Sequence, residues 1–240
     1  MEKEEFKNLL SKETRKINID LSNEQLEKFY LYFKLILEWN KKFNLTAITD
    51  PNDIIIKHFV DSLTASIHIK IGSSVVDCGT GAGFPGIPLA IVRNDCKLVL
   101  FDSLNKRITF IKEVIDNLEL KNVVAIHSRA EDLAYNKEYR EQFDYAISRA
   151  VANMSTLLEY LLPFCKTNGL AICMKGSNIT EELENCKNSL KILNGKIEKR
   201  DNFVLPDSEY TRNIILVRKI GHIPQKFPRR QGKPAKEPLG

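Results

Sequence analysis

The residues with the clearest chemical signature lie between Asp77 and Gly86, in the order Asp-Cys-Gly-Thr-Gly-Ala-Gly-Phe-Pro-Gly. Apolar runs before and after this segment predict a buried strand, a glycine-rich turn and a helix. Such a turn lets the backbone approach a ligand closely at the end of a parallel strand. Residues 81–86 also match the G-x-G-x-x-G pattern of dinucleotide sites, which alone is a weak signal. The sequence therefore predicts a nucleotide-like ligand at this turn.

The charge of Asp77 indicates which ligand binds there. A carboxylate at the start of the helix repels a diphosphate but attracts the ammonium group of S-adenosyl-L-methionine, which carries no phosphate. We therefore expect S-adenosyl-L-methionine as the cofactor, with Asp77 beside its ammonium group and Gly81 in the binding loop. A nicotinamide dinucleotide is the disfavoured alternative.

Acidic residues follow the next two predicted strands. Asp102 ends the apolar run 97–101, where a carboxylate can accept hydrogen bonds from ribose hydroxyls in methyltransferases and dehydrogenases alike. Ala130, Glu131 and Asp132 follow the run 123–126 and are placed to meet an adenine. The alternative for these three residues is an acidic first turn of a helix.

The end of the fourth predicted strand, Ser148-Arg149-Ala150, is where methyl-transfer folds place their acceptor. It lacks the Asp/Asn-Pro-Pro-aromatic motif of exocyclic-amine methyltransferases and the nucleophilic cysteine of cytosine-C5 enzymes. A guanine N7 has an exposed lone pair. Its methylation therefore requires only that the guanine be positioned in line with the methyl group and that the charge of the transition state be stabilised. Arg149 is the candidate catalytic residue because it can donate to guanine O6. Pairing with Asp144 and contact with the cofactor carboxylate remain open alternatives.

An α/β architecture is predicted to position these residues. Helical spacing of apolar residues predicts helices in the first 70 residues, one of them preceded by a capping box of Ser22 and Gln25. From about residue 72, apolar runs alternate with helical stretches, which predicts a parallel sheet covered on both faces. The runs 197–203 and 213–217 predict an antiparallel edge. We expect an N-terminal helical extension (1–70), a catalytic core (71–219) and a C-terminal tail (220–240).

The basic charge of the chain is concentrated at its C-terminus. The net charge of the 240 residues is +5, but residues 218–240 carry +6 and residues 1–217 carry −1. A basic tail is typical of a protein that binds a polyanion such as nucleic acid, and a solvated tail is the alternative. Four prolines exclude a continuous helix and favour an extended strip along RNA, with Phe227 stacking on a base. We expect cofactor binding to survive removal of this tail.

Other basic residues complete the predicted RNA-binding set. Lys175 and Arg212 are expected to join the Arg149 side of a basic cleft, with ordinary surface charges as the alternative. The predicted RNA-binding residues are Lys175, Arg212, Lys226, Phe227, Arg229, Arg230 and Lys233.

Several classes of protein are disfavoured by the sequence. Five cysteines with no C-x-x-C pair and no nearby histidine indicate neither a disulfide framework nor a metal site. No apolar stretch approaches the roughly 18 residues of a membrane helix, and the acidic N-terminus does not resemble a signal peptide. We therefore expect a cytoplasmic protein with no membrane partner, and a monomer by default.

Six ordered blocks resemble the bacterial ribosomal RNA small-subunit methyltransferase G family, also called glucose-inhibited division protein B. The blocks are Trp39-Asn-Lys-Lys-Phe-Asn-Leu-Thr46, Lys57-His-Phe-Val-Asp-Ser-Leu63, residues 77–88, Asp102-Ser103 with Lys106-Arg107, Ser148-Arg-Ala-Val-Ala152, and Phe227-Pro-Arg229 with Gly232, Pro234 and Pro238-Leu239. Together they extend over nearly the whole chain.

The resemblance implies a class I S-adenosylmethionine-dependent methyltransferase with a Rossmann-like, mostly parallel seven-stranded sheet, an antiparallel edge and an N-terminal helical extension. It implies N7 methylation of a guanine in a decoding-region loop of 16S rRNA, either as free RNA or within the small ribosomal subunit. The implied cofactor contacts are Gly79, Phe84, Ala130, Glu131 and Arg149. Family members often have Val or Ile at the position of Cys78 and Ser at the position of Thr80. Cys78 and Thr80 are both small enough to preserve the backbone path.

The sequence leaves open the role of His58 and the class of protein. His58, Asp61 and Ser62 share one face of a predicted helix, and the resemblance favours a polar cluster facing the site, whereas a lone histidine is more often structural. The alternatives to a methyltransferase are a non-catalytic ribosome-binding or rRNA-binding assembly factor and, less favoured, a nicotinamide-dependent oxidoreductase.

Overall fold

A seven-stranded sheet forms the centre of the protein, whose computed structural model describes residues 1–239. The strands are β1 (Ser74–Cys78), β2 (Lys97–Asp102), β3 (Val123–His127), β4 (Phe143–Arg149), β5 (Cys165–Lys175), β6 (Gly195–Val204) and β7 (Thr211–Lys219). Their order in the sheet is β3-β2-β1-β4-β5-β7-β6. Strands β1 to β5 pair in parallel, and β7 is antiparallel to both β5 and β6. The predicted parallel sheet with an antiparallel edge is confirmed.

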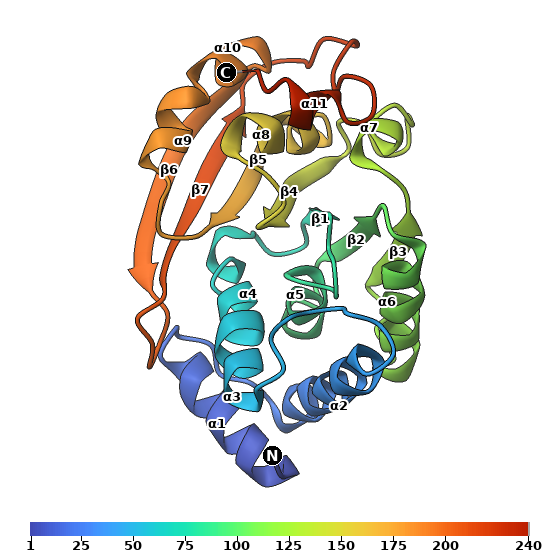
Figure 1. Ribbon diagram of the computed structural model, residues 1–240, viewed down its shortest axis with the longest axis vertical. Coiled ribbons are helices and arrows are strands. Elements are labelled where there is room, and N and C mark those ends of the chain that lie inside the picture. Colours follow the sequence, from blue (N-terminus) through green and yellow to red (C-terminus); the bar gives the residue numbers. More distant parts are fainter. Residues whose placement is uncertain (240) are drawn as a thin grey trace.

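Helices cover both faces of this sheet (Figure 1). On one face lie α1 (Lys3–Arg15), α2 (Asn23–Asn40), the continuous segment α3 (Pro51–Asp53), η1 (Ile54–Val60) and α4 (Asp61–Leu63), then α5 (Gly86–Val92) and α6 (Asn105–Asn117). On the other face lie α7 (Ala130–Leu133), α8 (Met154–Leu161), α9 (Thr180–Asn185), α10 (Lys187–Ile192) and α11 (Lys233–Lys236). The short 3₁₀ helix η2 (Ser66–His68) leads into β1.

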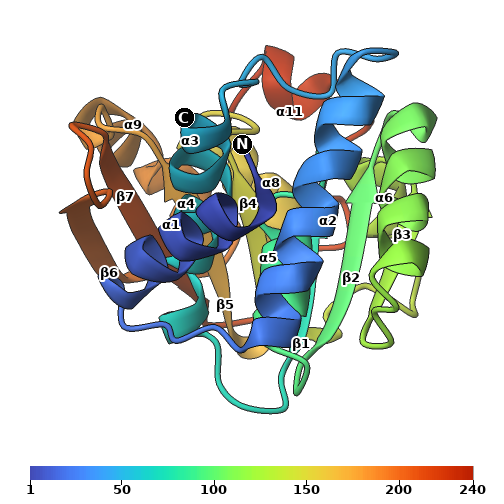
Figure 2. The same cartoon turned by 90° about the horizontal axis from the view of Figure 1, so that it is seen from below.

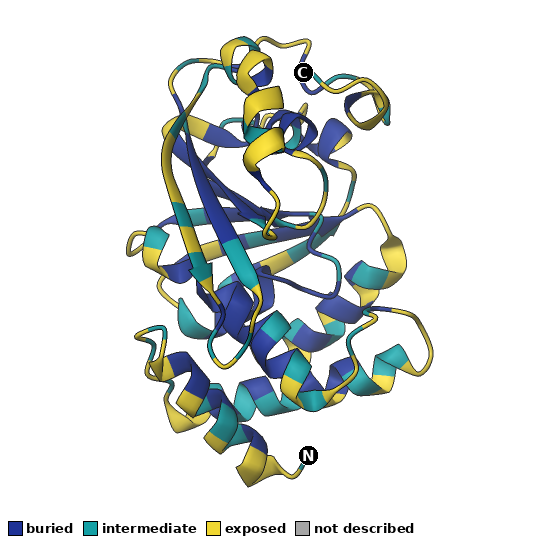
Figure 3. Ribbon diagram, turned by 60° about the vertical axis from the view of Figure 1, so that its left-hand side comes forward, coloured by how far each residue is buried: buried dark blue, intermediate teal, exposed yellow. Residues whose placement is uncertain are grey.

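Alternation of side chains along the strands divides the core into two clusters. Val75 of β1 and Ile147 of β4 face the first helical layer, whereas their neighbours Val76 and Ala146 face the second. This is the period of two that a sheet covered on both sides requires. Figure 3 shows the inner strands of the sheet buried, the edge strand β6 largely exposed, and exposed residues on the outer sides of the helices.

The N-terminal helices belong to the first of these clusters. The predicted capping box at the start of α2 is confirmed, since Ser22 Oγ accepts from the Gln25 N–H and the Gln25 side chain accepts from the Ser22 N–H. Helix α1 crosses beside α2 (Figure 2), and the ring of its Phe6 stacks on Phe33 with centroids 5.0 Å apart. Phe29 of α2 contacts Phe59 of η1 at 5.2 Å. Residues 1–70 therefore pack directly on the sheet.

The C-terminal segment differs from the predicted extended strip. Phe227 is only 4% exposed and belongs to the second core cluster. Helix α11 forms with Pro234 in its first turn, where the missing N–H of proline leaves no helical hydrogen bond unmade. The Thr156 hydroxyl of α8 donates to the Pro234 carbonyl at 2.9 Å. The expected strip is wrong because burying the Phe227 ring in the second core cluster is more favourable than exposing it.

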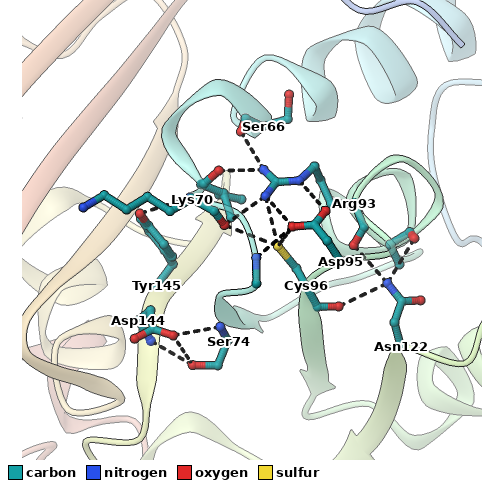
Figure 4. Close-up of polar contacts among 12 residues, drawn as sticks. Ser66, Lys70, Ser74, Arg93, Asp95, Cys96, Asn122, Asp144 and Tyr145 are labelled. Atoms are coloured by element: carbon teal, nitrogen blue, oxygen red, sulfur yellow. Dashed lines mark hydrogen bonds and ion pairs between the residues drawn. The ribbon is translucent and has the colours of Figure 1, made fainter.

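A polar cluster around Arg93 joins the linker after η2 to the amino-terminal end of the sheet (Figure 4). The Arg93 guanidinium donates to the carbonyls of Ser66, Ile69 and Lys70, the shortest of these bonds being 2.6 Å. Asp95 accepts from Arg93 at 2.8 and 2.9 Å and from the Gly72 N–H at 2.9 Å. Arg93 thus donates hydrogen bonds to carbonyls of η2 and of the linker that follows it. Through Asp95, which binds the Gly72 N–H, the same cluster holds the residues that lead into β1.

Replacing Arg93 with alanine should lower the free energy of unfolding by about 2 kcal/mol, because several carbonyls lose their donor at once. Urea denaturation of both proteins measures the difference. The matched control is Arg15→Ala, which removes an exposed ion pair with Asp20 and should change stability by less than about 0.5 kcal/mol. Equal stabilities of wild type and Arg93→Ala would contradict this role.

Candidate active site

A cleft of about 850 Å³ opens at the carboxyl ends of the parallel strands. This volume lies in the range of roughly 300–1,000 Å³ that small-molecule sites occupy. Among the predicted site residues, those that line it are Gly79, Gly81, Phe84, Asp102, Ala130, Glu131, Arg149, Lys175 and Arg212. Those that do not are Asp77, Lys226, Phe227, Arg229, Arg230 and Lys233. The fold therefore brings most of the predicted cofactor residues together.

The position of Asp77 corrects the predicted contact with an ammonium group. Its carboxylate is 1% exposed, and its Oδ2 accepts a hydrogen bond from the Gly86 N–H at 2.9 Å, at the start of α5. Burial raises the pKa of Asp77 to about 7, against the opposing effects of the Thr80 hydroxyl and the Gly86 N–H. Asp77 therefore engages the Gly86 N–H at the helix N-terminus, which is a group that a bound phosphate would otherwise contact.

A second carboxylate fixes the glycine-rich loop from the neighbouring strand. Asp102 Oδ2 accepts from the Gly81 N–H at 2.9 Å and from Arg107 at 3.1 Å, and Oδ1 accepts from the Leu104 N–H. Gly81 has a φ of +62°, and no atom lies within 4 Å of the position that a Cβ would take. At Gly79, φ is +70° and a Cβ would come within 2.9 Å of Val151. The positive φ at both positions favours glycine, and both residues line the cleft.

The C-terminal segment forms one wall of this cleft. Glu131 Oε1 accepts a hydrogen bond from the Gly232 N–H at 3.0 Å. Gly232, Ala235 and Tyr160 all line the cleft beside Glu131. Sequence reasoning missed these three residues, because a contact between positions 131 and 232 leaves no local pattern.

On the opposite side of the cleft, the carboxylate of Asp61 binds two arginines. Its Oδ2 accepts from Arg149 Nη1 and from Arg212 Nε, both at 3.2 Å. Its Oδ1 is buried and has no partner among residues 1–239. The alternative pairing of Arg149 with Asp144 is wrong, since Asp144 lies near the amino-terminal end of β4 and binds Ser74 and Lys166.

His58 is held as a neutral imidazole beside this ion-pair cluster. Its Nδ1 lies 3.2 Å from Arg149 Nη2, and its Nε2 lies 2.9 Å from Thr46 Oγ1. Because arginine can only donate, Nδ1 is the acceptor and the proton resides on Nε2. Burial, followed by the charge of Arg149, lowers the pKa of His58 to about 3. The ring also stacks on Phe84, with centroids 4.3 Å apart.

Besides Arg212, which binds Asp61, three more of the predicted RNA-binding residues are engaged within the protein. Arg229 binds the fully buried Glu159 through its Nε and Nη2, the shortest bond being 2.7 Å. Lys175 contacts Glu182 at 2.6 Å and the Ala152 carbonyl at 2.7 Å. Phe227 is buried. Because Arg229 and Phe227 anchor the C-terminal segment to α8 and the core, we no longer assign them to RNA. Lys226, Arg230 and Lys233 are exposed.

The described part of the chain, residues 1–239, contains no group of three or more His, Cys, Asp or Glu side chains able to hold a metal ion. Within the same residues no helix is both long and apolar enough to cross a bilayer. All five cysteines are buried and unpaired with one another.

The fold is that of class I methyltransferases. A methyltransferase from Aquifex aeolicus, described as SAM-dependent, is 19% identical and covers 72% of this chain and 96% of its own, with a TM-score of 0.54. The M. jannaschii TYW2 structure, solved in complex with AdoMet, is 17% identical and covers 67% of this chain and 75% of its own, with a TM-score of 0.54. At these identities the likeness concerns the fold alone.

The chain belongs to the rRNA small subunit methyltransferase G family, whose family model matches residues 25–218. It is similar to the ribosomal RNA small subunit methyltransferase G of Acetivibrio thermocellus, 49% identical over 92% of this chain and 91% of that protein. The protein of the same name from Clostridium beijerinckii is 48% identical over 98% of this chain and 99% of its own length.

Asp77→Asn should change how stability depends on pH. A carboxyl whose pKa in the folded protein is about 7 stabilises the fold most below its ordinary pKa of 3.8 and loses that contribution as pH rises through 7. Asparagine keeps an acceptor for Gly86 but does not ionise. Relative to wild type, the variant should therefore gain about 2 kcal/mol of unfolding free energy between pH 5 and pH 8. Denaturant titrations at both pH values measure this, and a pH-independent difference would contradict it.

Proposed function

We propose that this protein transfers a methyl group from S-adenosyl-L-methionine to N7 of a guanine in a decoding-region loop of 16S rRNA. Membership of the rRNA small subunit methyltransferase G family is the observation that carries the proposal. The class I methyltransferase fold and its cleft support it. We further propose that the working form is a cytoplasmic monomer, since one chain supplies both sides of the cleft, and that the substrate is 16S rRNA or the small subunit that contains it.

The residues of one side of the cleft fit this cofactor. The open backbone at Gly81 leaves room for close approach, and Asp102 has further acceptor capacity for ribose hydroxyls. Ala130 and Glu131, opposite Gly232, are the proposed adenine wall. Because Asp77 already fills the start of α5, a diphosphate-containing cofactor is disfavoured.

The residues of the other side fit an acceptor that needs no general base. When bound, S-adenosyl-L-methionine supplies a methyl group activated by its sulfonium charge. His58 is neutral, and its Nδ1 already accepts from Arg149, so it is not positioned to remove a proton. The N7 lone pair of guanine requires no such removal. Arg149, fixed by Asp61, is proposed to donate either to guanine O6 or to the cofactor carboxylate.

The exposed cations of the C-terminal segment are the proposed RNA contacts of this region. Lys226, Arg230 and Lys233 are exposed on the same segment whose Gly232 reaches Glu131. Phosphate contacts of this kind contribute affinity that falls as the salt concentration rises. We propose that one segment thereby closes the cofactor cleft and contacts the RNA.

Methylation of 16S rRNA by the purified protein tests this function. With radiolabelled donor, wild type should transfer label to one guanine, and mapping should place the methyl group on N7. Arg149→Ala should lower kcat/KM by at least about 100-fold, a typical loss for a removed transition-state donor. Lys166→Ala, which removes an exposed charge near the other end of β4, should have no effect.

The same assay separates the alternatives. A loss of cofactor affinity in Arg149→Ala would assign Arg149 to the donor, whereas a loss of turnover alone would assign it to the guanine. If neither changes, both proposed roles are wrong. Tight RNA binding without label transfer by wild type would instead indicate a non-catalytic assembly factor.

Deleting residues 230–240 should weaken cofactor binding about tenfold, because the deletion removes the Gly232 and Ala235 part of the cleft wall. This reverses the expectation drawn from the sequence. Phe227 and Arg229 remain in the shortened protein, which keeps the buried ring and the ion pair with Glu159, while Thr156 and Ser189 lose the carbonyls of Pro234 and Leu239 to which they donate. Isothermal titration with S-adenosyl-L-methionine measures the effect, and Lys226→Ala is the control for loss of an exposed charge on the same segment outside the cleft. Unchanged affinity of the shortened protein would restore the original expectation.

A further inference from the structure

Tyr210 is an aromatic residue that lines the cleft without being buried. It lies between β6 and β7 and is 43% exposed. Of the other aromatic residues that line the cleft, Phe84 and Phe101 are only 6% and 1% exposed, and Tyr160 and Phe203 are partly buried. The Tyr210 ring therefore contributes little to the core, and its exposed surface is available at the cleft.

Two cations flank this ring. Lys57 Nζ lies 4.4 Å from the ring centroid, and the guanidinium carbon of Arg212 lies 5.8 Å from it. Both cations are themselves fixed, Lys57 by Asp53 at 2.7 Å and Arg212 by Asp61 at 3.2 Å. An aromatic face beside positive charge is the combination that unpaired bases of single-stranded nucleic acids bind.

The hairpin that bears Tyr210 is anchored to the N-terminal helix. Asp207 at its tip contacts Lys12 at 3.1 Å and Lys16 at 2.6 Å. Leu205, at the start of the turn, is 1% exposed, and its N–H donates to the Tyr210 carbonyl at 3.0 Å. These contacts place the ring at a defined position, so that little ordering is needed when a ligand binds.

The register of the sheet locates Tyr210 on the acceptor side. Arg149 of β4 pairs with Met174 of β5, and Met174 pairs with Ile214 of β7. Tyr210 directly precedes β7 and thus lies beyond Arg149, whereas Asp102 and Glu131 belong to elements on the other side of β1. The ring is therefore separated from the proposed ribose and adenine walls.

We propose that Tyr210 stacks on an unpaired base of the RNA acceptor loop and holds it against the Arg149 side of the cleft. This inference rests on the proposed methylation of 16S rRNA. A base that leaves its neighbours to reach an active site loses stacking energy. The Tyr210 ring replaces part of that stacking, while Lys57 and Arg212 provide positive charge beside it.

Steady-state methylation by four variants tests the proposal. Tyr210→Ala and Tyr210→Leu should raise KM for 16S rRNA about tenfold, which corresponds to about 1.4 kcal/mol, because both lose the π-face. Tyr210→Phe should retain wild-type KM. Val204→Ala, an exposed apolar position on the same hairpin that does not line the cleft, is the matched control. Affinity for S-adenosyl-L-methionine should be the same in all five proteins.

Fluorescence anisotropy with a labelled 16S rRNA fragment measures RNA affinity independently of turnover. The stacking role is overturned if Tyr210→Leu binds RNA as wild type does, since apolar bulk then suffices. It is also overturned if Tyr210→Ala loses cofactor affinity, which would place the ring against the donor. Failure of wild type to methylate would reject the proposed function, while the anisotropy series would still decide whether Tyr210 contacts RNA.

Discussion

Two buried carboxylates hold the backbone of the glycine-rich loop, and the rest of the cleft is arranged around that loop. Asp77 binds the Gly86 N–H at the start of α5, and Asp102 binds the Gly81 N–H from the neighbouring strand. From the opposite side, the Tyr32 hydroxyl of α2 donates to the Ala82 carbonyl at 2.5 Å. A loop restrained from three directions presents its amide groups in a fixed arrangement, which lowers the entropic cost of binding a ligand.

The Arg149 side of the cleft depends on the N-terminal helices in the same way. Asp61 belongs to α4, yet its partners Arg149 and Arg212 belong to β4 and β7. Removing one partner from such a buried cluster leaves an uncompensated charge, which is costly. Residues 1–70 are therefore part of the site. They place the carboxylate that determines where two cations of the cleft point.

Local sequence patterns predicted the sheet, the glycine-rich loop and the acidic residues Asp102 and Glu131 that line the cleft, whereas Gly79 and Phe84 were predicted from the family resemblance. Strand alternation and the position of Asp102 after an apolar run are properties of neighbouring residues, which the sequence displays directly. The contact of Asp61 with Arg149 joins positions 88 residues apart and has no such signature. The burial of Phe227 and the exposure of Tyr210 likewise depend on tertiary packing. Asp77 was predicted to contact an ammonium group, but its carboxylate is buried away from the cleft and accepts from the Gly86 N–H at the start of α5.

The most direct test of this account is a pair of calorimetric titrations of the purified protein, one with S-adenosyl-L-methionine and one with NAD⁺. Because Asp77 occupies the start of α5, we predict saturable one-to-one binding of S-adenosyl-L-methionine and no measurable heat with NAD⁺ at the same concentrations. Saturable binding of NAD⁺ together with no heat from S-adenosyl-L-methionine would contradict the account.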